Sequence, residues 1–248
     1  MTATCASLLA FVSGACADTD TNVRSTEAPV LAELFTSQSC SSCPPAEALF
    51  AELADEPGLV TIEWHVDYWD DLVYGREGRW EDPYSQASHT RRQRDYNMSL
   101  RGTMSVYTPQ AIVNGQSELV GSHRDKLNTA IESADPASIA LSVARTADGI
   151  KVSLPQGQDA PSAIIRHVRL LEKQSTSVKG GENAGRELAS RNIALSSAVL
   201  GKWDGTSALS LSAPTPEAGE NCAILVQQTA ERGLGPVLAA RYCPEAGA

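Results

Sequence analysis

The sequence predicts an α/β unit followed by an all-β sandwich, and three observations lead to this fold class. A strand-like apolar run at 30–35, a helical pattern and a second apolar run at 59–66 follow one another in the order of a parallel βαβ unit. Beyond residue 135, short strand-like runs at close spacing are typical of a β-sandwich. The length of 248 residues also favours two modest domains.

The N-terminus predicts export. Residues 1–17 contain no charged side chain, hold an apolar core and end in Ala15-Cys16-Ala17, which is the pattern of a cleaved signal peptide. Cys16 offers an alternative, because the residues before it resemble a lipoprotein signal and would place a lipid anchor there. Residues 18–28 form a polar linker. We therefore expect a periplasmic or secreted protein, with no transmembrane segment in the mature chain.

The N-terminal domain is expected at 29–135, with a helical insertion at 67–100. Asn114-Gly115 marks a tight hairpin turn, and Asp135-Pro136 marks the end of the domain, because a proline pushes its predecessor out of helical geometry. The expected elements are strand 30–35, helix 46–54, strand 59–66, helix 85–98, the hairpin around 114–115, and helix 124–133.

The C-terminal domain, at 136–248, is expected to consist of strands. Asp148-Gly149 marks one hairpin turn. Cys222 and Cys243 flank the last two strands, and a register centred on the intervening turn places them directly opposite each other, which predicts a structural disulfide. The expected strands lie at 138–144, 150–154, 163–171, 186–200, 208–212, 222–229 and 236–242.

Charge and cysteine content narrow the classes of partner. The net charge of −10 argues against nucleic acid, since phosphate neutralisation needs a clustered basic face. We interpret the basic run at 91–94 as a solvated helix face. Cleavage of the signal peptide would leave four of the six cysteines, as two pairs, which fits an oxidising compartment.

Cys40 and Cys43 form a CxxC motif where the first strand gives way to the first helix. A helix N-terminus directs unpaired backbone N–H groups and the positive end of its dipole at the first sulfur, which favours thiolate over thiol. Cys43, one turn further on, can close a small disulfide. The alternatives are a static disulfide and a structural metal pair, although no second CxxC or Cys/His pair supplies the ligands of a closed zinc site.

The order of elements around this motif is similar to the thioredoxin fold. Residues 105–121 look like the thioredoxin segment in which a cis-proline faces the active-site disulfide. This resemblance implies a thioredoxin-like N-terminal domain in which Pro109 is cis, Cys40 is the nucleophile and Cys43 resolves the mixed disulfide.

Further stretches in both domains carry a narrower resemblance. They are Glu33–Gln38 with the CxxC, His65–Asp70, Arg92-Gln93 with Tyr96, Tyr107–Gln110, and Gly181–Arg186. In these stretches the chain resembles an uncharacterised family of secreted bacterial thioredoxin-like proteins, the domain-of-unknown-function family 1223. This resemblance implies a fold and no established activity. From the residues themselves we interpret Gly180–Arg186 as a turn fixed by the side chains of Glu182 and Asn183.

Five further residues are candidates for a substrate groove. The carboxyl ends of parallel strands line one crevice, so the loop after strand 59–66, with Asp67 and Trp69, should lie beside Cys40. The thioredoxin resemblance adds Tyr107, Thr108 and Gln110, which flank the expected cis-proline.

Two residues are candidates for a proton relay. Thioredoxins carry a buried acid on the strand before the CxxC that helps to move the proton of the resolving cysteine. Glu33 is the nearest acid here, one residue farther from the motif than expected. His65 is the second candidate, and it could instead ligate copper beside the thiolates or pack against the sheet.

The leading hypothesis is an exported thiol–disulfide oxidoreductase that acts on protein or small-molecule thiols and disulfides without a cofactor or metal. Cys40 would attack, Cys43 would resolve and Pro109 would shape the site. One alternative is a non-catalytic envelope binding or assembly module with a static CxxC disulfide. Another is a copper-handling protein that uses both thiolates with His65.

Overall fold

The computed structural model describes Met1 and residues 29–72, 74–75, 78–135, 139–156 and 160–245. The expected signal peptide after Met1, Cys16 and the linker lie outside the described residues. Within the ranges just given, no helix is long and apolar enough to cross a membrane.

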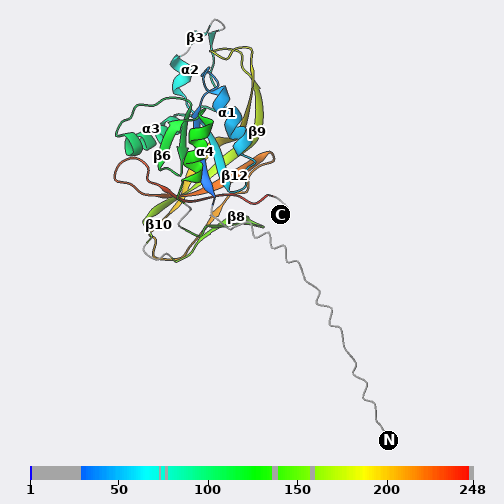
Figure 1. Ribbon diagram of the computed structural model, residues 1–248, viewed down its shortest axis with the longest axis vertical. Helices are drawn as coiled ribbons and strands as arrows, with labels where there is room; N and C mark the ends of the chain where they lie inside the picture. The colour runs from blue at the N-terminus through cyan, green and yellow to red at the C-terminus, as the bar shows by residue number, and fades with distance from the viewer. Residues whose placement is uncertain (2–28, 73, 76–77, 136–138, 157–159, 246–248) are drawn as a thin grey trace.

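The fold is mixed α/β and is built on one eight-stranded sheet with the order β13-β12-β9-β10-β2-β1-β5-β6 (Figure 1). A separate three-stranded sheet has the order β11-β8-β7. The elements are β1 (Val30–Thr36), α1 (Pro44–Leu53), β2 (Leu59–His65), α2 (Tyr68–Leu72), β3 (Tyr74–Gly75), β4 (Gly78–Arg79), α3 (Ala87–Arg101), β5 (Gln110–Val113), β6 (Ser117–Val120), α4 (Arg124–Glu132), β7 (Ser142–Thr146), β8 (Gly149–Leu154), β9 (Ala163–Ser177), β10 (Glu187–Trp203), β11 (Leu209–Ala213), β12 (Glu220–Gln228) and β13 (Val237–Tyr242).

The predicted βαβ unit is confirmed. β1 pairs in parallel with β2 across α1, and β5 pairs with β1 in the antiparallel direction. Both central strands are buried along almost their whole length, which explains why they read as continuous apolar runs rather than alternating ones. The β5–β6 hairpin turns at Asn114 and Gly115, with φ of 47° and 65°, as the Asn-Gly pair predicted.

The C-terminal strands continue the same sheet. β9 and β10 form a hairpin of 15 and 17 residues, longer than predicted, and β10 joins β2 in parallel where Ile193 lies opposite Glu63. The described residues from 139 to 245 contain strands and no helix, as predicted. Because one sheet runs through both segments, the division into domains at 135 stays a prediction.

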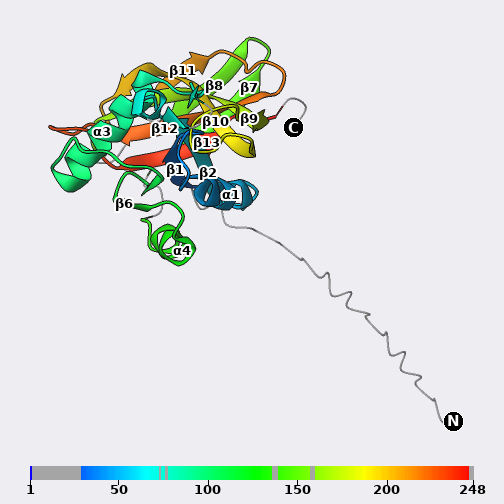
Figure 2. The same cartoon turned by 90° about the horizontal axis from the view of Figure 1, so that it is seen from above.

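The sheet curls, so that β13 lies against β1 and β2 although it is not their neighbour in the sheet. The central core lies inside this curl and is closed by α3, with Phe35, Tyr96 and Leu225 among its members. α1 and α4 cover the outer face of the N-terminal strands, and the three-stranded sheet covers the outer face of β9 and β12 (Figure 2).

Two cross-links fix β13: a disulfide to its neighbour β12, and a set of hydrogen bonds that closes the curl. Cys222 and Cys243 lie directly opposite in the β12–β13 register and form a disulfide, as predicted. The Tyr242 hydroxyl accepts hydrogen bonds from the Thr61 backbone N–H and the Asn192 side chain, both at 2.8 Å, and donates to the Thr61 carbonyl at 3.0 Å. One hydroxyl therefore ties β13, β2 and β10 together.

We predict that Tyr242→Phe lowers the free energy of unfolding by about 2 kcal/mol, because it leaves buried polar groups of Thr61 and Asn192 without their partner. Urea denaturation measures this change. Tyr84→Phe is the matched control, since the Tyr84 hydroxyl forms no hydrogen bond within the described residues, and it should change stability much less. Equal effects of the two substitutions would contradict the assigned role of Tyr242.

Candidate redox site

Cys40 and Cys43 are joined in a disulfide at the N-terminus of α1, where Cys43 is the N-cap residue. Pro44 and Pro45 occupy the first helical positions, which suits proline because it has no N–H to leave unpaired. The expected array of first-turn N–H donors for the sulfur is therefore reduced. The Cys40 Sγ instead contacts the Ser42 hydroxyl, at 3.3 Å.

Both cysteines are fully buried, at 0 % exposure, although Ser41 and Ser42 between them are exposed. The sulfur of Cys40, which the leading hypothesis makes the attacking group, is therefore not exposed to solvent in this structure. The loop between β9 and β10 covers the motif: Asn183 donates to the Cys40 carbonyl at 2.9 Å, and Glu182 accepts from the Ser41 N–H at 2.9 Å. The yellow turn of the long hairpin reaches the top of the molecule beside β3 in Figure 1.

Pro109 lies at the same end of the sheet as the disulfide. The Thr108–Pro109 peptide bond is cis, as the resemblance implied. The β1–β5 register pairs Phe35 with Gln110, so the next position brings Pro109 opposite Thr36, at the end of the strand that leads into the CxxC. The Pro109 side chain is buried.

Trp69 and Thr108 come together beside this proline, whereas Gln110 does not face a groove. The Trp69 indole N–H donates to the Thr108 hydroxyl at 2.6 Å, and both side chains are partly exposed. Gln110 is fully buried and its amide donates to Asn97 and Glu118 at 2.8 and 2.9 Å. It has no surface to offer a substrate in this structure.

The other two groove candidates are held by intramolecular hydrogen bonds. The Asp67 carboxylate accepts from the Thr90 hydroxyl, which links the loop after β2 to α3. The Tyr107 hydroxyl donates to Glu118 at 2.6 Å, and its ring lies under the Arg101 guanidinium. Both side chains remain partly exposed.

Glu33 faces the central core rather than the helix that carries Cys43. It accepts from Arg92 at 2.7 Å and from the Trp64 indole at 2.8 Å, and it is also bonded to the Tyr96 hydroxyl. Because strand residues alternate between faces, Glu33 lies on the opposite side of β1 from α1, which packs on Leu34. Arg92 is accordingly a buried ion-pair partner and not part of a solvated helix face.

His65 lies on the α1 side of β2, fully buried between two carboxylates. Its Nδ1 donates to Asp82 at 2.7 Å, and its Nε2 faces Glu63 at 3.8 Å. Burial disfavours the charge, but the two carboxylates outweigh burial and raise the pKa of His65 to about 10. A ring held this way is not available to a copper ion at the cysteines.

Glu47 is the acid that sequence reasoning missed. It follows Cys43 by one helical turn, so both side chains lie on the inner face of α1. Its carboxylate is buried and accepts from the Thr36 hydroxyl at 2.6 Å. Burial, and then the nearby Glu63 carboxylate, raise the pKa of Glu47 to about 7. The i, i+4 spacing from Cys43 was a sequence signal that could have identified it.

Asp82 is a second residue that sequence reasoning missed, because it comes from the insertion. Its carboxylate accepts from the Gln38 backbone N–H at 2.8 Å as well as from His65. Burial opposes its charge, but the paired His65 outweighs burial and lowers the pKa of Asp82. One carboxylate thus links His65 to the chain segment that enters the CxxC.

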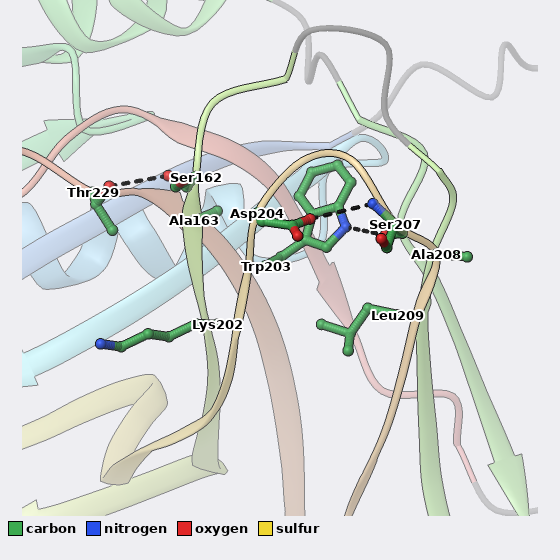
Figure 3. Close-up of a pocket in the computed structure, with 9 residues that line it drawn as sticks. All are labelled: Ser162, Ala163, Lys202, Trp203, Asp204, Ser207, Ala208, Leu209 and Thr229. Atoms are coloured by element: carbon green, nitrogen blue, oxygen red, sulfur yellow. Dashed lines mark hydrogen bonds between the residues drawn. The ribbon is translucent and has the colours of Figure 1, made fainter.

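A pocket of about 300 Å³ lies at the other end of the β9–β10 hairpin (Figure 3). Ala163 pairs with Trp203 there, whereas Ser177 pairs with Glu187 at the end near the CxxC. The 15 residues of β9 separate the two ends by roughly 45 Å. The Trp203 indole N–H donates to the Ser207 carbonyl at 2.6 Å, and the Ser207 N–H donates to the Asp204 carboxylate at 3.2 Å, so this pocket is a separate feature from the cysteines.

Fold and site together define a mixed α/β protein with a buried CxxC disulfide at a helix N-terminus. The chain belongs to the family described as "Protein of unknown function (DUF1223)", whose model matches residues 31–227. No curated protein matches it.

Two solved structures resemble the chain. Protein AGR_C_4864 from Agrobacterium tumefaciens is 25% identical, with a TM-score of 0.74, over 90% of this chain and 98% of that protein. HBP35 of Porphyromonas gingivalis is 12% identical, with a TM-score of 0.58, over 88% of this chain and 75% of that one, and shows a likeness in fold alone.

We predict that Glu47→Gln changes how stability depends on pH. The folded protein retains the Glu47 proton up to a pKa of about 7, whereas the unfolded chain loses it near 4.5, so folding of the wild type becomes less favourable as pH rises through this window. The variant has no carboxyl group at position 47, so its stability does not fall for this reason. The free energy of unfolding of the variant, minus that of the wild type, should therefore be about 2–3 kcal/mol larger at pH 8 than at pH 5.

Urea denaturation at the two pH values measures this difference. Glu56→Gln is the control, because Glu56 is exposed just after α1. If Glu47→Gln and Glu56→Gln follow the same pH profile, Glu47 does not titrate in this window.

Proposed function

We propose that the protein is an exported thiol–disulfide oxidoreductase, with a thioredoxin-like N-terminal part, a β-sandwich C-terminal part, and Cys40 and Cys43 as its redox pair. The observation that carries the proposal is the buried, titratable Glu47 carboxyl one turn after Cys43. A dithiol must release protons when it forms a disulfide, and a permanent disulfide has no use for a proton acceptor.

The arrangement of elements supports the proposed fold assignment. β1, α1 and β2, the β5–β6 hairpin and α4 follow the order of a thioredoxin-like unit, with Pro109 next to the end of β1. The three-stranded sheet packs on β9 and β12 as the second layer of a sandwich would. Export is supported by the signal-like residues 1–17 and by the second cysteine pair.

The proposed chemistry is a two-electron exchange. The Cys40 thiolate attacks a substrate disulfide and releases one substrate thiolate, leaving a mixed disulfide. The Cys43 thiol passes its proton to the Glu47 carboxylate, and its sulfur attacks Cys40. The second substrate thiolate leaves, so the substrate is reduced and the Cys40–Cys43 disulfide forms. Run in reverse, the same steps oxidise a substrate dithiol, and Glu47 returns the proton to Cys43.

The residues around Pro109 are the proposed substrate contacts. Trp69 and Thr108 are joined by a hydrogen bond and partly exposed, so they can form one wall of a groove. Asp67 and Tyr107 lie in the neighbouring loops and are partly exposed as well. His65 and Asp82 act by holding the segment before Cys40 in place, and not as proton carriers at the sulfur.

A second candidate function is a non-catalytic envelope binding or assembly module. The complete burial of both cysteines favours it, because a permanent disulfide is best protected from attack. The two candidates differ in one property: the oxidoreductase must expose Cys40 while the protein stays folded.

We predict that Cys43→Ser traps a mixed disulfide at Cys40, since the resolving thiol is gone. Incubation of the folded variant with oxidised glutathione should add one glutathione, detected by mass spectrometry, whereas Cys40→Ser should add far less. Absence of the adduct until denaturant unfolds the protein would support the static module instead.

We predict that Glu47→Gln slows resolution of the mixed disulfide by about 10²-fold at pH 7, because a positioned general base typically contributes at least that much. Stopped-flow mixing of the reduced protein with a peptide disulfide separates this step from the first attack. The rate of the first attack should change little. If both steps slow equally, Glu47 is not the base for Cys43.

A further inference from the structure

The loop that covers the disulfide is held by a buried side chain. The Asn183 amide nitrogen donates to the carbonyls of Gln38 and Cys40, both at 2.9 Å, and the residue is fully buried. Arg186 donates to the Asn183 amide oxygen at 3.0 Å and so fixes the orientation of the amide. The loop thus satisfies two backbone acceptors that flank Cys40.

The same loop also uses a backbone donor of the motif and approaches it closely. The exposed Glu182 carboxylate accepts from the Ser41 N–H at 2.9 Å. Gly181 has a φ of 68°, and a Cβ there would lie 3.3 Å from the Ser39 hydroxyl, so glycine allows the loop to lie on the motif.

The base of the loop is closed by its own hydrogen bonds. The Val178 N–H donates to the Arg186 carbonyl at 2.9 Å, and the Gly185 N–H donates to the Val178 carbonyl at 2.8 Å. Beyond it, β9 and β10 pair along their whole length. Residues 179–184 can therefore leave the motif without separation of the hairpin, at the cost of the hydrogen bond from the Gly181 N–H to the Gly78 carbonyl of β4 at 3.1 Å.

The groups that the loop satisfies around Cys40 are all backbone groups, namely two carbonyls and one N–H. A polypeptide carries both N–H donors and C=O acceptors along its backbone, so it can replace these partners at the turn around Cys40. A small thiol lacks this array. With the loop in place the sulfurs have no exposure, so an incoming sulfur must first displace it.

We infer that residues 179–184 occupy the surface on which a polypeptide substrate docks, and that the Cys40–Cys43 pair reacts preferentially with polypeptides because they replace the hydrogen bonds of the loop. This inference rests on the proposed redox function. It adds the class of substrate and the loop that controls access to the disulfide. The C-terminal strands then serve to present the loop to the motif.

The test compares two thiols of matched chemistry. N-acetylcysteine methylamide and an unstructured ten-residue peptide with one central cysteine are offered at equal concentration to the oxidised, folded protein. Alkylation and mass spectrometry follow reduction of Cys40–Cys43, with Cys222–Cys243 as the internal reference. We expect the peptide to react at least about 10-fold faster, and the same peptide N-methylated beside its cysteine to lose this advantage, because it lacks the backbone donors.

Loop variants test the displacement. Asn183→Asp replaces the donor by a carboxylate facing two carbonyls, so the small thiol should react at least about 10-fold faster and the peptide preference should shrink. Glu182→Gln removes only an exposed charge, so the variant should fold normally. It should raise the rate of the small thiol by less than Asn183→Asp does. Glu172→Gln, on the exposed surface of β9, is the control and should match wild type.

Equal rates for both thiols and for all loop variants would overturn the docking inference while leaving the redox function intact. If the disulfide of Asn183→Asp resists both thiols until the chain unfolds, the redox function fails, and the inference fails with it. Circular dichroism of each variant establishes that the chain remains folded during the measurement.

Discussion

The pairing of β10 with β2 is the constraint on which the rest of the structure depends. It is short, with Ile193 opposite Glu63, yet it makes the C-terminal strands part of the sheet that carries the CxxC. The β9–β10 loop lies on the segment that follows β1, where Asn183 donates to the carbonyls of Gln38 and Cys40. The covering of Cys40 by Asn183 therefore depends on the long hairpin, because the loop could not stay on the motif without the strands that hold its base.

Two groups of buried charge lie on opposite faces of the N-terminal strands, and they differ in electrostatics. Inside the curl, Glu33 and Arg92 form a paired, fully hydrogen-bonded ion pair of the kind that tolerates burial. Beneath α1, the carboxylates of Glu47, Glu63 and Asp82 lie near a single cation, His65. Asp82 forms the shortest contact with His65, at 2.7 Å. Burial, and then the Glu63 carboxylate, raise the pKa of Glu47. The cluster with excess negative charge is therefore the one beneath α1, on the side of the sheet that carries the cysteines. Perturbed pKa values of this kind are common at functional sites.

Much of the secondary structure was predictable from local pattern. The βαβ unit, the Asn114-Gly115 hairpin and the Cys222–Cys243 pairing all rest on short-range signals, and the structure contains each of them. The prediction ended β9 near Leu171, because Glu172–Ser177 is polar and lacks an apolar alternation. Pairing with β10 holds that segment as a strand, and propensity cannot report such a partner. The same limit applies to Asp82, whose role depends on where the insertion folds back.

By itself the sequence determined the position of the CxxC pair, since a CxxC between a buried strand and an amphipathic helix puts both sulfurs at a helix N-terminus whatever surrounds them. Only the tertiary structure decided which acid lies on the same side as that pair and whether the sulfurs are exposed. Glu33 and Glu47 are both buried acids close to the motif in the chain, but strand alternation sends one into the central core and helix periodicity brings the other under Cys43. Access to Cys40 was decided by residues about 140 positions away, through hydrogen bonds that no local pattern encodes.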